Sequence, residues 1–528
     1  MRTKKLLFPA LFFSAGATLV ISLFAKQMVG QRAKRTAKLM PIEPTPDADP
    51  WDAINAYINA QMRRLHIPGA ALAIIEDDQT VYQRGFGRAR PGGEIPTPLT
   101  PFFIGSLTKS FTALAVMQLV EAGKIELDAP VQRYLPWFQV ADPQASAQMT
   151  VRHLLNQTSG LPMLLGMAAL GNIDSRPGAA KRQVQALSTL KLTRPVGSKC
   201  EYSNLNYNIL GLVIEAASGE VYADYVQKHI FDPLEMRHSF TTKATAQQNG
   251  LAVGYRHWFS LPFPAPDLPI PHGSLASGQL ISCAEDMTHY LIAHLNGGRY
   301  GNAQILSSAS IDELHRGVME LKMGEIGGGL YGMGWFDIDL GQTKTYSHGG
   351  NVPDFSAFMA LIPEEKRAAV LLLNADPYGL PIITEEIGMG VTALLAGQQP
   401  APNKLDFIQW IIRLLPLIPL LQVAGVYGTM HMLDQREKNP ANRPDCRRKW
   451  RRQILLPLIP NLSLTAILIY LRSSGLMGYL HFYNPDLAWI ARISGTFAGI
   501  WAFLRIGLIL HAMRKPQRPG MQLEDNPL

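Results

Sequence analysis

A Ser-x-x-Lys box stands directly in front of a long apolar stretch, and this pair of features constrains the 528-residue chain more than any other. Ser106 and Lys109 are followed by apolar residues at helical spacing as far as Val120, and Gly123 is a natural stop residue. A helix that is apolar on most sides must be buried in the core of a large domain. Three positions apart, the hydroxyl and the amine share one helix face, so the amine can take the serine proton.

The helix behind Ser106 separates this box from a chance match. A helix N-terminus directs unpaired backbone N–H groups and positive potential at any negative charge that develops beside the serine. The same pattern recurs at Ser188 and Lys191, but Pro195 and Gly197 follow within a few residues and no helix can form there. We therefore interpret Ser106 as an acylating nucleophile and the second match as coincidence.

Charge is distributed unevenly along the chain. The formal net charge of +8 comes from 49 Lys+Arg and 41 Asp+Glu; residues 39–404 hold 26 and 34 of these, which leaves 23 and 7 for the two ends. The basic excess therefore lies beside apolar segments, where it indicates membrane orientation and argues against nucleic-acid binding. Cys200, Cys283 and Cys446 have no metal-ligand spacing and no disulfide framework, so we expect no metal and no cofactor.

The first 38 residues are predicted to be a signal or anchor segment. Residues 6–25 are apolar and long enough to span a bilayer, and they follow Arg2, Lys4 and Lys5. Leu23 would stand at the minus-three position of a cleavage after Ala25, where a small residue is needed, so an uncleaved anchor is favoured over a signal peptide. Residues 39–50 then form a linker rich in proline and aspartate.

Residues 407–513 are predicted to hold three transmembrane helices, over 407–433, 454–471 and 487–512, after a linker at 398–406. The loop between the first two carries eight Lys and Arg residues, so the positive-inside rule places it in the cytoplasm, together with the tail 514–528. Counting the crossings back places the large domain outside a cell membrane that the chain crosses several times. Basic residues after the first segment oppose this orientation, but the loop is shorter and denser in charge. The alternative, that these segments are core helices of a soluble domain, is disfavoured by their length and tryptophan content.

Residues 51–397 are predicted to be one α+β domain. A helix at 51–65 and strands at 70–76 and 81–86 open it, and strands at 355–362 and 368–373 with a helix at 381–395 close it. Strands at both ends with helices between them imply one antiparallel sheet built from both ends of the domain, flanked by helices, with an all-helical insertion.

A second motif, Tyr202-Ser203-Asn204, follows the serine box by about a hundred residues. A tyrosine beside cations could be partly ionised, and so act as a general base or relay protons to the leaving group. Asn204 could hold Lys109 or a substrate amide by hydrogen bonds. Tyr57-Ile58-Asn59 matches the same pattern, but it lies in the predicted helix at 51–65, where packing is the expected role.

A third motif, at residues 347–351, precedes the strand predicted at 355–362. Gly349 and Gly350 let the backbone approach a substrate closely. The backbone N–H groups of Asn351 and Ser106 are predicted to form an oxyanion hole, worth roughly 3 kcal/mol per donor. His348 would then line the cleft; the alternative is a surface histidine in a glycine turn.

Taken in chain order, the Ser-x-x-Lys box, the Tyr202-Ser203-Asn204 motif and the motif at residues 347–351 resemble those of the serine β-lactamase and penicillin-binding protein superfamily, specifically its class C β-lactamase-like branch. The resemblance covers roughly residues 50–397 and extends to Thr150–Leu155, Thr158–Leu161, Asn204–Gly211, Phe231–Leu234 and Tyr331–Trp335. It implies a β-lactamase/DD-peptidase-like fold and an acyl-enzyme mechanism. Class C enzymes carry K-T-G at the third element, where this chain has His348-Gly349-Gly350. A largely neutral histidine binds a substrate carboxylate less well than lysine, which favours an esterase or D-amino-acid peptidase over a potent β-lactamase.

The expected function is thus that of a membrane-anchored serine hydrolase that acts on a small ester or peptide substrate. The alternative is a catalytically marginal, penicillin-binding-like sensor that signals through its membrane helices. The intact Ser106, Lys109 and Tyr202 argue against that alternative. The oligomeric state is not predicted.

Overall fold

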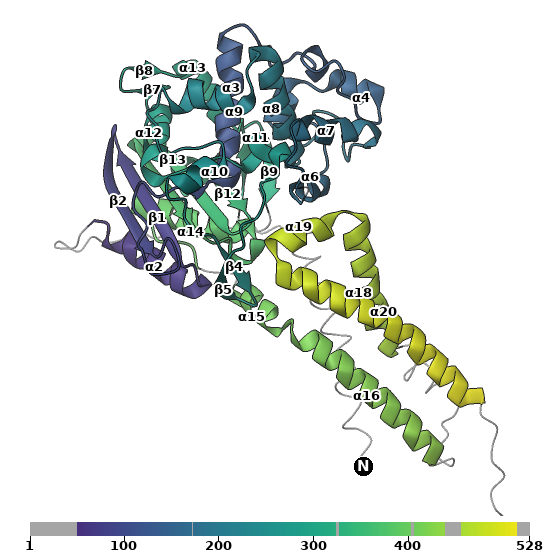
Figure 1. Cartoon of the computed structure of the whole chain (residues 1–528). Coiled ribbons are helices and arrows are strands. Elements are labelled where there is room, and N and C mark those ends of the chain that lie inside the picture. Colours follow the sequence, from purple (N-terminus) through teal and green to yellow (C-terminus); the bar gives the residue numbers. More distant parts are fainter. Residues whose placement is uncertain (1–49, 172, 324–326, 403–405, 439–455, 515–528) are drawn as a thin grey trace, which may run out of the picture. The chain divides into compact units, whose positions relative to one another are not determined.

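The computed structural model describes residues 50–171, 173–323, 327–402, 406–438 and 456–514 (Figure 1). The predicted anchor at 6–25, most of the basic loop and the tail after Arg514 lie outside these residues. The chain forms two compact units. The main unit comprises the described residues up to Arg413 together with Ser474–Asp486, and the helical unit comprises the remainder. Cys446 lies outside the described residues, and Cys200 and Cys283 are free thiols.

The main unit is built on one eight-stranded antiparallel sheet with the order β2-β1-β14-β13-β12-β11-β10-β9. The N-terminal hairpin joins the C-terminal hairpin directly, because Ala70 of β1 is paired with Leu373 of β14. This arrangement confirms the predicted sheet made from both ends of the domain. The strands are β1 (Gly69–Glu76), β2 (Gln79–Gly87), β9 (Met319–Met323), β10 (Gly327–Tyr331), β11 (Phe336–Leu340), β12 (Thr343–Val352), β13 (Phe355–Ile362) and β14 (Arg367–Leu373).

Both faces of the sheet are covered, since every residue of β13 is buried. Helices α2 (Asp52–Leu65) and α14 (Pro381–Leu395) pack together, and α14 lies against β12, β13 and β14. The other face, with Ala357 and Met359, belongs to the main hydrophobic core and packs against α12 (Ala284–Leu295). The continuous apolar character of the central strands follows from this double burial.

The segment between the two hairpins contains mainly helices and three small two-stranded sheets. Its helices are α3 (Thr108–Glu121), α4 (Pro143–Gln148), α5 (Val151–Leu155), α6 (Met163–Leu170), α7 (Ala179–Gln185), α8 (Asn204–Ser218), α9 (Tyr222–Val226), α10 (Lys243–Gln248), α11 (Leu275–Gly278), α12 and α13 (Ser308–His315). The small sheets pair β3 (Phe102–Phe103) with β6 (Ile281–Ser282), β4 (Tyr255–Trp258) with β5 (Leu261–Pro264), and β7 (Arg299–Tyr300) with β8 (Ala303–Gln304).

Helix α3 is buried over most of its length, as its apolar sequence predicts, and it packs against α8 and α9 (Figure 1). Every residue from Thr108 to Met117 is buried, polar ones included. The chance Ser-x-x-Lys match has a different setting, because Ser188 and Lys191 are both exposed and only a short 3₁₀ turn, Ala186–Thr189, lies there.

The structure differs from the sequence prediction at the third motif. Residues 347–351 precede the strand at Phe355–Ile362 as predicted, but they also lie inside a strand of their own, β12, which was not predicted and is paired with β11 on one side and β13 on the other. Strands β9 to β11 were not predicted. Glycine has a low strand propensity, and pairing with two neighbours overrides it.

Among the residues that the structure describes, two helices are long and apolar enough to cross a membrane, by length and composition. They are α18 (Leu456–Ser473) and the first 28 residues of α20 (Pro485–Arg514), and they coincide with the predictions at 454–471 and 487–512. The predicted span at 407–433 is divided between α15 (Asp406–Leu414) and α16 (Leu417–Lys438) and is not one of the two.

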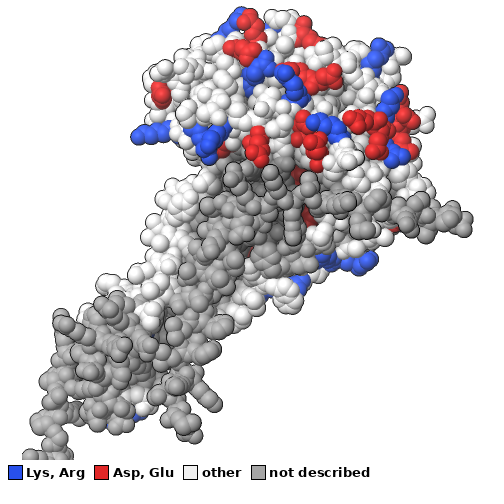
Figure 2. Space-filling model, turned by 180° about the vertical axis from the view of Figure 1, so that it is seen from behind, with Lys and Arg blue, Asp and Glu red and all other residues white. Residues whose placement is uncertain are grey.

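Acidic and basic side chains are interspersed on the face of the main unit that Figure 2 shows. The mixture is the pattern expected of a solvated protein surface.

Candidate active site

Ser106 lies at the point where the central helix begins. It is part of a 3₁₀ turn, Gly105–Leu107, that leads directly into α3. Gly105 has a φ of +55°, and a Cβ atom on it would come within 2.5 Å of the backbone nitrogen of Asn351. Glycine at this position therefore allows β12 to lie directly beside the serine.

The hydroxyl of Ser106 is held by two side chains that come from different parts of the sequence. Lys109 Nζ donates to Ser106 Oγ over 2.9 Å, and Tyr202 OH donates to the same oxygen over 2.9 Å. Lys109 Nζ also donates to Asn204 Oδ1 over 2.8 Å and to the carbonyl oxygen of Ser277 over 2.6 Å. The structure thus brings Ser106, Lys109, Tyr202 and Asn204 together as the sequence predicted.

The environment of Lys109 disfavours its charged form. The side chain is fully buried, and burial lowers its pKa well below the usual range for lysine. Its three hydrogen-bond acceptors are a hydroxyl, an amide and a carbonyl, all of them neutral. The rings of Tyr202 and Tyr207, whose centroids lie 4.9 and 5.7 Å from Nζ, complete the surroundings of the amine. A neutral amine has only two N–H donors, and when these are directed at Asn204 and the carbonyl of Ser277, its lone pair faces Ser106 Oγ and can accept the serine proton.

The environment of Tyr202 keeps its phenol protonated. Burial raises the pKa of Tyr202, and the negative charge of Glu385 raises it further. The sequence interpretation allowed a partly ionised tyrosine, but these effects oppose ionisation. The phenol is instead placed as a proton donor toward Ser106 Oγ.

The glycines of the third motif lie where a side chain would collide with the serine segment. A Cβ atom on Gly350 would come within 2.1 Å of the carbonyl oxygen of Ile104 and 3.0 Å of the backbone nitrogen of Ser106. The side chain of Asn351 is turned to other partners, since its Nδ2 donates to Asp376 Oδ1 and to Thr384 Oγ1 over 2.8 and 2.9 Å. The backbone of Asn351, and not its side chain, therefore lies beside the serine segment. The role of its backbone N–H group in an oxyanion hole stays a prediction.

His348 is buried, with 2% of its surface exposed, so the alternative of a surface histidine in a turn was wrong. Its Nδ1 donates to the carbonyl oxygen of Gly349 over 2.6 Å, which leaves Nε2 to accept from Tyr331 OH at 3.3 Å. Burial lowers the pKa of His348 to about 3. The imidazole is therefore neutral at physiological pH.

Residues 54–382 match the family described as Beta-lactamase. The chain belongs to this family. It is 26% identical over 343 residues to protein flp of Staphylococcus aureus strain MW2, a match that covers 64% of this chain and 66% of that protein. It is 29% identical over 317 residues to penicillin-binding protein 4 of Amycolatopsis lactamdurans, covering 58% of this chain and 81% of that protein. The octameric penicillin-binding protein homologue of Pyrococcus abyssi has a similar structure, with a TM-score of 0.57 at 30% identity, over 66% of this chain and 78% of that one.

Three groups at the site of this β-lactamase-family chain were missed by the sequence analysis. They are the carbonyl of Ser277, the phenol of Tyr331 and the carboxyl group of Glu385. A Cβ atom on Gly349 would lie 2.3 Å from Glu385 Oε1, so this carboxyl group packs directly on β12. Tyr331 lies in a stretch that the resemblance had already marked, whereas nothing in the local sequence distinguishes Glu385 from other residues of α14.

The backbone at Gly334 packs closely against the backbone of Lys109 and Ser110. Its φ is +82°, and a Cβ atom on it would come within 2.8 Å of Ser110 Cα and 2.9 Å of the carbonyl of Lys109. We expect Gly334→Ala to destabilise the protein by about 2 kcal/mol and to lower activity, because the backbone of Lys109 must shift. Urea unfolding and ester turnover measure the two effects. Gly301→Ala is the matched control, since Gly301 has a φ of +54° with no atom within 4 Å of a Cβ. An equal loss of activity in both variants would contradict the predicted steric clash between a side chain at position 334 and the backbone of Lys109.

The carboxyl group of Glu385 makes stability dependent on pH. Burial raises the pKa of Glu385 to about 7. Between its ordinary pKa and about 7, the folded protein binds the proton that the unfolded chain has lost, so this residue's contribution to stability falls as pH rises. We expect Glu385→Gln to raise Tm at pH 8 by about 3 °C and to leave it unchanged at pH 4. Thermal unfolding at both values tests this, with the exposed Glu364→Gln as control. An equal Tm shift at the two pH values would contradict the assignment.

Proposed function

We propose that the chain is a membrane-anchored serine hydrolase that forms an acyl-enzyme at Ser106 with an ester or amide substrate. The observation that carries the proposal is the convergence of an amine and a phenol, each 2.9 Å from one serine oxygen. The depressed pKa of Lys109 and the raised pKa of Tyr202 give the two groups opposite proton preferences. Paired groups of this kind act as base and acid in acyl transfer.

In the acylation step, neutral Lys109 takes the proton of Ser106 while Oγ attacks the substrate carbonyl carbon. The backbone N–H groups of Ser106 and Asn351 stabilise the oxyanion that develops on the carbonyl oxygen. The bond to the leaving group then breaks, and Tyr202 supplies the proton that the leaving group needs. Lys109 returns its proton to Tyr202, so both groups end the step in their starting states.

In deacylation Lys109 is again the base, and water takes the place of the serine as the attacking group. A water molecule attacks the ester carbon of the acyl-enzyme and gives its proton to Lys109. The bond to Ser106 Oγ breaks, the acid leaves, and the proton returns to the serine. No group is oxidised or reduced, and the residues of the site suffice for both steps.

The neutral imidazole of His348 supports the choice of substrate class. A neutral histidine offers no positive charge to a substrate carboxylate, which disfavours potent β-lactamase activity. An esterase or D-amino-acid peptidase fits this site better. The intact hydrogen bonds among Ser106, Lys109 and Tyr202 also support catalysis over a purely sensory role.

The position of α19 (Leu476–Tyr483) supports the proposed orientation in the membrane. This helix belongs to the main unit, while α18 before it and most of α20 after it belong to the helical unit. If α18 and α20 span a bilayer, their ends next to α19 must lie on the side of the hydrolase. The basic loop before α18 then lies on the opposite side, which is the cytoplasmic one by the positive-inside rule.

A fluorophosphonate probe tests the proposal directly, because it bonds to activated serines. The wild-type chain should take up one probe, and peptide mapping should place it on the peptide that contains Ser106. The peptide that contains Ser188 is an internal control. Labelling elsewhere, or no labelling at pH 8, would reject the assigned nucleophile.

A further inference from the structure

A cavity of about 370 Å³ lies in the main unit, in the size range of sites for small molecules. Three of its lining residues stand next to the catalytic groups along the chain. Val352 follows Asn351, Gln279 is two residues after Ser277, and Phe103 is three residues before Ser106. These three segments also carry Ser106, the carbonyl of Ser277 and Asn351, so the cavity adjoins the catalytic site through them, although the catalytic side chains themselves do not line it.

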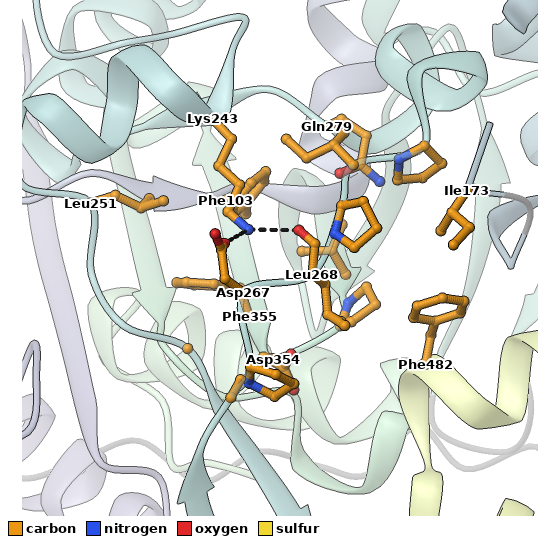
Figure 3. A pocket seen from close by; sticks show the side chains of 18 of the residues that line it. Phe103, Ile173, Lys243, Leu251, Asp267, Leu268, Gln279, Asp354, Phe355 and Phe482 are labelled. Atoms are coloured by element: carbon orange, nitrogen blue, oxygen red, sulfur yellow. Dashed lines mark hydrogen bonds and ion pairs between the residues drawn. The ribbon is translucent and has the colours of Figure 1, made fainter. Parts of the chain in front are cut away.

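One wall of this cavity comes from α19. Phe482 and Tyr483 line it, and Figure 3 shows Phe482 at the same side of the cavity as Ile173. The helix is held closely to the rest of the main unit, because a Cβ atom on Gly171 would lie 2.8 Å from the backbone of Gly478. The residues that follow it are also anchored, since Asp486 Oδ2 accepts from the backbone N–H of Phe259 over 2.9 Å. The wall is therefore an ordered part of the unit.

The charged groups that line the cavity are paired with one another or with neighbours. Lys243 forms an ion pair with Asp267 and donates to the carbonyl oxygen of Leu268 over 2.7 Å (Figure 3). Asp354 forms an ion pair with Arg256 over 2.7 Å. The remaining lining is mostly apolar, with side chains such as Phe355 and Pro271. A cavity of this kind suits a hydrocarbon group better than a polar or charged one.

The connections of α19 indicate where such a group would come from. Two residues separate it from α18 and one residue separates it from α20, the two helices that are long and apolar enough to span a membrane. With both neighbours in a bilayer, α19 must lie at the bilayer surface. The wall formed by Phe482 is then within reach of molecules whose chains are dissolved in the lipid.

We propose that this cavity binds the acyl chain of an amphiphilic ester or amide that resides in the bilayer, which deepens the proposed function and rests on it. The acyl side of the substrate is favoured over the leaving group by the position of the catalytic groups. Val352, which lines the cavity, comes directly after the oxyanion donor Asn351, whereas no lining residue is a near neighbour along the chain of Tyr202, which gives the leaving group its proton. The chain of the acyl group would run past Val352 toward α19.

The test compares p-nitrophenyl decanoate with p-nitrophenyl acetate on the full chain in phosphatidylcholine vesicles. The readout is the ratio of kcat/KM for the long ester to that for the short one. Phe482→Asp should lower this ratio about tenfold and leave acetate hydrolysis within about twofold of the wild type, because a carboxylate opposes burial of the chain. Partition of the ester into lipid is the same for all variants, so differences between variants report the cavity.

Three further variants make the outcome decisive. Phe482→Leu, which keeps the wall apolar, should retain most of the wild-type ratio, and Phe263→Asp, at an exposed phenylalanine outside the cavity, should retain all of it. Ile173→Asp, at a partly exposed position of the cavity, should lower the ratio as Phe482→Asp does, and it serves if the latter fails to fold. A ratio unchanged in Phe482→Asp and in Ile173→Asp, or an equal loss with both esters, would overturn the proposal while Ser106-dependent acetate hydrolysis still supports the hydrolase. No Ser106-dependent turnover of either ester would reject both.

Discussion

Ser106→Ala is expected to lower kcat/KM for an activated ester by about 10⁵-fold, the loss typical of removing a nucleophile from an intact site. The fold should persist, because Lys109 keeps its bonds to Asn204 and to the carbonyl of Ser277. Tyr202 loses its acceptor, but its ring remains packed edge-on against Tyr331, with centroids 6.1 Å apart. Initial rates with p-nitrophenyl acetate, beside circular dichroism of the same preparation, measure both parts of the expectation.

Ser188→Ala is the matched control for this variant. It removes the serine of the second Ser-x-x-Lys match, which is exposed and has no helix behind it. Its rate should equal that of the wild type. If Ser106→Ala retained more than about a hundredth of the wild-type rate, the acyl-enzyme mechanism at this residue would be wrong.

The core of the fold was predictable because the decisive patterns are local. Strand β13 and helix α14 have the predicted bounds, since their apolar runs are long and end at turn residues. The catalytic hydroxyl, amine and phenol were predictable from three short motifs and their order. Strand β12 was not, because its glycines are disfavoured in strands and are stabilised there by pairing with both neighbours.

Two features of the site depend on distant packing and leave no local trace in the sequence. Glu385 looks like any polar residue of a helix, and its raised pKa arises only because α14 packs on the glycines of β12. Helix α19 lies between two apolar segments and was interpreted as part of a membrane region, yet it belongs to the main unit. In both cases a glycine allows the close packing: Gly349 of β12 lies against Glu385 of α14, and Gly171 lies against Gly478 of α19.

Lys109→Met should lower kcat/KM by about 10⁴-fold, the upper part of the range for loss of a general base. The isosteric side chain fills the same buried space but has no lone pair to accept the serine proton. The pH profile should change as well. Since burial lowers the pKa of Lys109, the wild-type rate should rise with pH at values well below the ordinary lysine pKa, as the ammonium group loses its proton. This rising limb should be absent from the residual rate of Lys109→Met.

Lys109→Arg separates a proton acceptor from a group that only positions the serine. Arginine can donate to Asn204 and Ser277, but it is protonated and positively charged at every accessible pH, so it cannot accept a proton. We therefore expect it to be nearly as inactive as Lys109→Met, and Lys191→Met, in the exposed second match, to be fully active. Retention of a tenth or more of the wild-type rate by Lys109→Arg would exclude proton acceptance by this residue. Tyr202 would then have to act as the base, but its raised pKa keeps the phenol protonated near neutral pH, which makes it a poor proton acceptor.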